Sequence, residues 1–125
     1  MLTDTTFWID LLKERRDRSK GPASEFLARN RSSAIEMSII TWGELAGGFE
    51  SSAEMDNLFR GARILHLHMQ VAWEASRIER ELRNQGGKLG ENDNWIAATA
   101  RIWGLRLVSR DEAFARVPNL DIVSY

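Results

Sequence analysis

Short apolar runs alternate along this chain with longer stretches in which apolar residues recur every three or four positions. The short runs are typical of buried strands, and the longer stretches are typical of helices that bury one face. We expect strands at 1–3, 34–38, 64–67, 106–109 and 120–123. We expect helices at 4–13, 23–31, 41–49, 53–61, 69–84, 93–103 and 111–114. Because helices separate the successive strands, the pattern predicts crossover connections and a mainly parallel sheet.

The segment 69–84 shows the helical pattern most clearly, with apolar residues that fall on one face. They are Val71, Ala75, Ile78 and Leu82. Four or five strands with helices on both faces would form a three-layer α/β/α sandwich. A length of 125 residues is that of one ordinary domain, so we expect an α/β fold with a single domain over residues 1–125.

Composition limits the classes of function. The formal net charge is −1, so a polyanionic partner such as RNA would have to be met by a local basic patch or by a metal ion. Cysteine is absent, which excludes disulfides, thiolate zinc sites and a cysteine nucleophile. No segment has the features of a signal peptide or the roughly 20 apolar residues of a membrane span. We therefore expect a soluble, cytoplasmic protein with no membrane partner.

Four acidic residues stand near the ends of predicted strands. Asp4 follows the first strand, Glu44 the second and Asp111 the fourth, and Asp93 opens the helix that leads into the fourth strand. The carboxyl ends of parallel strands share one edge of a sheet, where α/β proteins bind ligands. Four carboxylates gathered there would repel one another strongly unless a cation lay among them. The pattern therefore predicts a divalent-metal site.

The chemistry of such a site is constrained by its ligands. Oxygen ligands, few histidines and no cysteine favour Mg²⁺ or Mn²⁺ over zinc. One ion can activate a water, and two can clamp both reacting oxygens of a phosphodiester. Each acid also has a simpler interpretation: Asp4, Asp93 and Asp111 could cap helices, and Glu44 could be a surface charge near a helix start. The shared site is favoured because the topology directs all four acids to one edge.

Four segments that carry these acids follow one another in a recognisable order. They are Asp4-Thr5, Thr41–Leu45 with Glu44, Asn92–Ala100 with Asp93, and Leu107–Asp111. In order and spacing they resemble the PIN domain, and most closely its VapC-like toxin ribonucleases from type II toxin–antitoxin systems. The resemblance covers almost the whole chain. Two departures are small: Thr6 stands where Asn or Ser is frequent in the family, and Ser109 where Thr is frequent.

This resemblance implies a Mg²⁺- or Mn²⁺-dependent endoribonuclease that cleaves single-stranded or loop RNA with a metal-activated water. It assigns Asp4, Glu44, Asp93 and Asp111 as the catalytic, metal-binding quartet, with Asp4 and Asp93 as the foremost direct ligands. It also implies a homodimer and a cognate VapB-like antitoxin that inserts a segment into or beside the acidic groove. A basic antitoxin side chain could then neutralise the quartet.

Three alternatives remain at this point. The chain could be a catalytically inactive PIN scaffold that acts as a protein- or RNA-binding module. It could be a HAD-type phosphatase with Asp4 as nucleophile, although that chemistry usually needs an Asp where Thr6 stands. It could also be a DNA-directed nuclease of the wider superfamily, although a short chain lacks the added elements that hold a duplex.

Other residues near the motifs receive simpler interpretations. Asp10 and Glu91 are expected to be surface charges, although Glu91 could also assist the site. Asn92 is expected to belong to a turn, with orientation of Asp93 as the alternative. Aromatic residues close to the acids are expected to pack in the core or an interface rather than to stack on bases. They are Trp8, Trp42 and Trp95.

Overall fold

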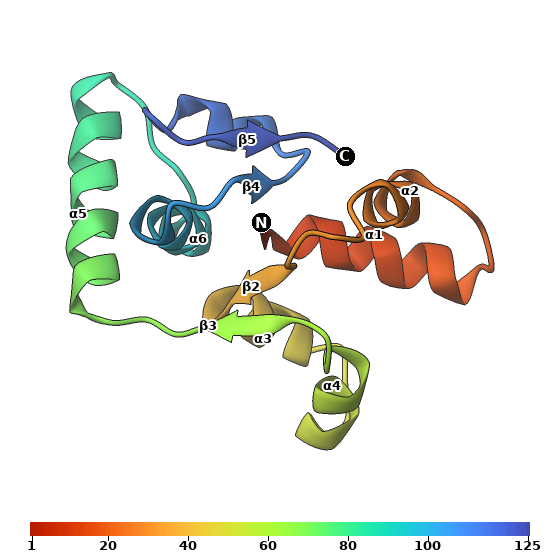
Figure 1. Ribbon diagram of the computed structural model, residues 1–125. Coiled ribbons are helices and arrows are strands. Elements are labelled where there is room, and N and C mark those ends of the chain that lie inside the picture. Colours follow the sequence, from red (N-terminus) through yellow and green to blue (C-terminus); the bar gives the residue numbers. More distant parts are fainter.

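Five short strands form the centre of the computed structural model, which describes residues 1–125 (Figure 1). They are β1 (Leu2–Thr3), β2 (Glu36–Ser38), β3 (Arg63–Leu65), β4 (Leu107–Val108) and β5 (Ile122–Val123). Their order across the sheet is β3-β2-β1-β4-β5, and every neighbouring pair is parallel. The predicted α/β fold with a parallel sheet is confirmed. Thr3 pairs with both Met37 and Val108, so Asp4 leaves the sheet from its central strand.

Helices cover both faces of this sheet. They are α1 (Thr5–Arg16), α2 (Pro22–Arg29), α3 (Ile39–Ala46), α4 (Ser52–Leu58), α5 (Met69–Asn84), α6 (Glu91–Trp103) and the 3-10 helix η1 (Glu112–Arg116). Figure 1 shows α5 and α6 together on one side of the strands, with α1 and α2 on the other. The predicted three-layer arrangement is therefore present.

Each layer of helices closes its own apolar core, because adjacent residues of a strand point to opposite faces of the sheet. Leu107 belongs to the core under α5 and α6, while its neighbour Val108 belongs to the core under α1 to α4. Trp8 lies in the second core, with its ring centroid 5.0 Å from that of Phe59. Trp42 and Trp95 also pack against these cores, so the expected packing roles of the tryptophans are confirmed.

The first helix extends further than its apolar pattern predicts. Helix α1 continues to Arg16 instead of ending near Lys13. In its last turns the carboxylate of Glu14 accepts the N–H groups of Ala23 and Ser24 at 3.0 Å and 2.8 Å. These N–H groups belong to the first turn of α2, where a helix has no acceptors of its own. The charged end of α1 therefore caps the next helix.

Helices α3 and α6 each begin two residues earlier than expected, and both changes affect the candidate site. Helix α3 begins directly after β2, because Ser38 Oγ accepts the N–H of Thr41 at 3.0 Å and caps the helix. Helix α6 begins at Glu91, so Asp93 lies inside its first turn and does not open it. The strands are also shorter than expected, and β3 ends at Leu65. No helix combines the length and apolarity needed to cross a membrane.

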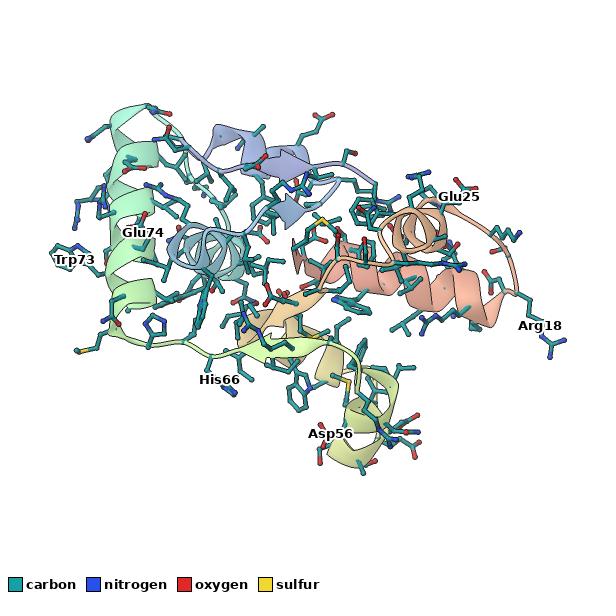
Figure 2. All side chains as sticks on the ribbon, viewed as in Figure 1. Arg18, Glu25, Asp56, His66, Trp73 and Glu74 are labelled. Atoms are coloured by element: carbon teal, nitrogen blue, oxygen red, sulfur yellow. The ribbon has the colours of Figure 1, made fainter.

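An ion network with little exposure joins α5 to α6. Arg101 Nε lies 2.8 Å from Glu74 Oε1, and the two side chains are 12% and 8% exposed. Arg101 Nη1 also donates to Glu81 Oε2 at 2.8 Å, and Arg77 lies 3.3 Å from Glu74. Figure 2 shows Glu74 on the α6 side of α5, while Trp73 points outward. One guanidinium therefore neutralises carboxylates that the packing of two helices encloses.

Replacing Arg101 with methionine should lower the free energy of unfolding by about 3 kcal/mol, because it leaves a buried carboxylate with only one partner. Urea denaturation at neutral pH measures this loss. The matched control is Arg83→Met, which removes an exposed pair with Glu79 and should cost less than about 1 kcal/mol. Equal losses in the two variants would show that burial of the network does not matter.

Candidate active site

Asp4 lies where the central strand β1 passes into α1, and it is almost fully buried at 2% exposure. Its Oδ1 accepts the N–H of Phe7 at 2.8 Å, so Asp4 caps α1. Its Oδ2 accepts the hydroxyls of Thr6 at 2.6 Å and of Ser109. One oxygen therefore caps the helix, and the other is oriented by hydroxyls from two parts of the chain. Thr6 occupies the place of the second acid that a HAD-type phosphatase usually needs.

Ser109 connects Asp4 to Asp111. Its Oγ donates to Asp4 and accepts the backbone N–H of Asp111 at 3.0 Å. Asp111 Oδ1 accepts the N–H of Ala113 at 2.8 Å and caps η1. Burial raises the pKa of the Asp4 carboxyl; the hydrogen bonds from Ser109, Thr6 and Phe7 oppose this rise, and the charge of Asp111 adds to it. The protonation of Asp4 therefore depends on the charge of Asp111.

Glu44 reaches the same place from α3. Its Oε2 accepts the hydroxyl of Thr5, and its Oε1 accepts the side-chain amide of Asn92 at 2.9 Å. These donors sit at the N-terminal turns of α1 and α6, beside Asp4 and Asp93. Glu44 is exposed, so its orientation depends on these contacts rather than on burial. Asn92 is not a turn residue as predicted, because it lies in α6 and donates to a site carboxylate.

Asp93 completes the group from the first turn of α6. Its carboxylate receives no hydrogen bond from the protein, and its Oδ2 lies 2.9 Å from where a Cβ on Gly90 would be. Burial raises the pKa of Asp93, and so do the negative charges of Asp111, Glu44 and Asp4. The structure therefore brings the four predicted acids into one cluster of mutually repelling charges.

The oxygen ligands at this site suit a hard, strongly hydrated cation. The cluster offers carboxylate and hydroxyl oxygens, which are ligands of the kind that Mg²⁺ and Mn²⁺ prefer. As the side chains stand, no three Asp, Glu or His residues converge to hold one ion. Mg²⁺ commonly keeps several waters and uses only one or two carboxylates directly, so this arrangement is compatible with it. The assignment of the four acids as direct ligands stays a prediction.

Two further acids close to the motif residues, Glu91 and Asp10, differ in their exposure. Glu91 is exposed at the start of α6, as expected of a surface charge. Asp10 is not a plain surface charge, because its side chain is 18% exposed and bonds both Arg110 and Tyr125. Sequence reasoning also missed Thr5, Asn92 and Ser109 as bonding partners of the acids. Their position beside Asp4, Asp93 and Asp111 was the only available signal.

The fold and this cluster agree with what the chain is similar to. The PIN domain family matches residues 1–120, and the chain belongs to that family. Ribonuclease VapC2 of Haemophilus influenzae is 34% identical over 126 residues, which cover 93% of this chain and 90% of that protein. Ribonuclease VapC1 of the same species, strain R2866, is 28% identical over 127 residues, covering 95% of this chain and 92% of that protein.

Solved structures of similar shape include toxin–antitoxin complexes. A DNA-bound VapBC from Salmonella typhimurium contains a chain with a TM-score of 0.83 and 26% identity, covering 98% of this chain and 96% of that one. A VapBC2 from Rickettsia felis, bound to a promoter DNA fragment, gives a TM-score of 0.81 at 21% identity, covering 99% and 97%. The second likeness shows the fold alone. The predicted resemblance to the VapC-like group of PIN domains is confirmed.

Asp93→Asn should raise the melting temperature of the metal-free protein by a few degrees, because it removes repulsion without removing a hydrogen bond. Thermal unfolding in EDTA measures the shift. A raised pKa means that the folded state holds its proton more tightly than the unfolded state. The ionised Asp93 therefore lowers the free energy of unfolding at neutral pH. This destabilisation disappears as the pH falls through the raised pKa of Asp93 toward the unfolded value of about 4.

The advantage of Asp93→Asn over wild type should therefore shrink on acidification. Glu91→Gln is the matched control, because it removes an exposed acid from the same helical turn and should leave the melting temperature nearly unchanged. A variant less stable than the metal-free wild type would contradict the repulsion at Asp93.

Proposed function

We propose that this chain is a Mg²⁺- or Mn²⁺-dependent endoribonuclease and the toxin half of a VapBC-like pair. The observation that carries the proposal is the shared repulsion of Asp4, Glu44, Asp93 and Asp111 at one edge of the sheet. The relatives' names as ribonucleases support RNA as the substrate class. A cation relieves such repulsion and also offsets the charge of a phosphodiester.

In this proposal two of the acids hold the metal ion, Glu44 accepts a proton, and Asp111 adds negative charge beside Asp4. When bound, the divalent ion would supply positive charge at the phosphate and lower the pKa of a water. Asp4 and Asp93 would hold it: Asp4 Oδ2 is oriented by Thr6 and Ser109, and Asp93 has no competing hydrogen bond from the protein. Glu44, exposed and steered by Asn92, would accept a proton from the attacking water at a carboxylate oxygen. No side chain needs to form a covalent bond to the substrate.

Asp93→Asn should lower RNA cleavage by about 10³-fold, since electrostatic stabilisation by a metal is worth several kcal/mol. Cleavage of a pool of short fluorogenic single-stranded RNAs, with Mg²⁺, with Mn²⁺ and in EDTA, measures the rate. Glu91→Gln should cleave like wild type. Mn²⁺ at 100 times its Kd should also raise the free energy of unfolding of wild type by about 2.7 kcal/mol, and with it the melting temperature. The rise in melting temperature should be much smaller for Asp93→Asn.

The same assay separates the enzyme from an inactive PIN scaffold. A scaffold would fold and bind RNA but would not cleave it with either ion. Cleavage in EDTA at the rate seen with Mg²⁺, or calorimetry without divalent binding, would reject the metal-dependent mechanism.

The groove beside Glu44 fits an antitoxin segment. It lies between α1 and α3 and has a volume of about 430 Å³. Its apolar lining includes Ile9, which is 53% exposed, and its basic lining includes Lys13 and Arg16. We propose that an amphipathic antitoxin segment binds here and places a cationic side chain among the acids. The solved VapBC complexes from Rickettsia felis and Salmonella typhimurium support a partner of this kind.

A second exposed surface suits a homodimer. Apolar residues gather at the N-terminal end of α5 and the C-terminal end of α6. They are Leu67, Met69, Trp73, Ile102 and Trp103, with Met69 83% and Trp73 65% exposed. Trp73 points away from the molecule in Figure 2. Aromatic side chains and methionine are enriched at the buried centres of interfaces, so we propose a second copy of this chain as the occupant.

The two surfaces can be tested as controls for each other. Ile9→Asp should weaken binding of the cognate VapB-like antitoxin by at least about 10-fold and leave the dimer intact, because loss of an apolar anchor acts locally. Trp73→Asp should give a monomer in sedimentation experiments and leave the antitoxin affinity within about 3-fold. Identical effects of both variants on both measurements would contradict the assignment of separate surfaces.

A further inference from the structure

Asp10 joins two distant parts of the chain on the outer side of α1. Tyr125 Oη donates to Asp10 Oδ2 at 2.7 Å, and Arg110 Nη2 donates to Oδ1 at 3.0 Å. The same Nη2 lies 3.0 Å from Oδ2, so Arg110 contacts both carboxylate oxygens. Both partners are at least 100 residues away from Asp10 in the sequence. This cluster therefore closes a long-range contact that secondary structure alone does not provide.

The aromatic partner is fixed on the same helix. The ring of Tyr125 packs edge-on against Phe7, with centroids 5.0 Å apart, and Phe7 is fully buried. The guanidinium of Arg110 lies 5.9 Å from the centre of the Tyr125 ring. Figure 1 shows the C-terminal end of the chain close to α1 and α2. Burial and the bond to Asp10 raise the pKa of the Tyr125 hydroxyl, which therefore remains a donor at neutral pH.

The position of Arg110 in the chain connects this cluster to the acids. Arg110 stands between Ser109, which donates to Asp4, and Asp111, whose N–H donates to Ser109. The segment 109–111 is also held by the N–H of Ser109, which donates to the carbonyl of Val123 at 3.1 Å, and by Asp111, which caps η1; neither contact reaches α1. Anchoring the side chain of Arg110 to α1 fixes this segment against the helix that Asp4 caps.

We propose that Asp10, Arg110 and Tyr125 form a positioning cluster that holds Ser109 and Asp111 against Asp4. The proposal rests on the proposed endoribonuclease function, and it adds residues that do not touch the reacting groups. Misplacing a catalytic group by about 1 Å can lower a rate by 10²-fold, so loss of the anchor should act mainly on kcat.

A different role for Arg110 predicts a different result. The side chain of Arg110 is 56% exposed, so it has access to a phosphate of bound RNA. If Arg110 contacted a phosphate, its removal would raise KM and weaken the dependence of binding on salt. In that case, removal of Asp10 would free the guanidinium and would not lower kcat.

The test is a double-mutant cycle on the full chain, using the RNA that wild type cleaves. Asp10→Asn and Arg110→Gln should each lower kcat by about 10-fold or more, and the double variant should be no slower than the slower single variant. The double variant Asp10→Arg with Arg110→Asp, which reverses the pair, should recover part of kcat. Calorimetry with Mn²⁺ should show several-fold weaker binding in both single variants, which is a measurement independent of turnover.

Two controls keep the result interpretable. Glu79→Gln breaks the exposed ion pair with Arg83 on α5 and should leave kcat and Mn²⁺ affinity unchanged. Tyr125→Phe keeps the ring on Phe7 and removes only the hydroxyl, so it tests the cluster if Asp10→Asn fails to fold, with a smaller loss of kcat expected. Wild-type kcat in Asp10→Asn, or an Arg110→Gln effect confined to KM, would overturn the positioning role. Absence of cleavage by wild type would instead reject the enzyme itself.

Discussion

Mutual repulsion among four carboxylates is the constraint on which the rest of this structure depends. Asp4, Glu44, Asp93 and Asp111 come from different elements, and no basic side chain pairs with any of them. Neutral donors hold three of them instead: hydroxyls, an amide and backbone N–H groups. Such donors orient a carboxylate without cancelling its charge. The cluster therefore keeps its attraction for a cation, while the surrounding cores supply the stability that the repulsion removes.

The architecture makes this concentration of charge possible. The central strand β1 has only two residues, yet it pairs on both sides and lies in the middle of the sheet. Asp4 follows it directly, so burial of the strand also buries the acid. The two cores lie on opposite faces of the sheet and leave the strand ends free for polar side chains. The Glu74–Arg101 network lies on the α5–α6 side, and there the charges are fully paired. The paired charges between α5 and α6 and the unpaired acids at the strand ends are therefore two different kinds of ionic cluster.

Much of this arrangement can be predicted from sequence. The alternation of strand and helix patterns predicts the parallel sheet, and the strand-end rule predicts that the four acids converge. Helix boundaries were less predictable. The end of α1 carries no apolar pattern, and its extension depends on a tertiary contact from Glu14 to the start of α2. The bonding roles of Thr5, Asn92 and Ser109 depend on the directions of side chains across the fold, which spacing does not encode. Asp10 was misread for the same reason, because its partners are remote in the sequence.

Gly90 illustrates how the absence of a side chain can shape the acidic cluster. Its backbone is not in the left-handed region, so the glycine is not needed for a turn there. What it provides is empty volume, because a methyl group in its place would approach the Asp93 carboxylate to 2.9 Å. An alanine at this position would force that carboxylate to shift while leaving every charge in place. The position of one charge at this edge of the sheet thus depends on a residue with neither charge nor side chain.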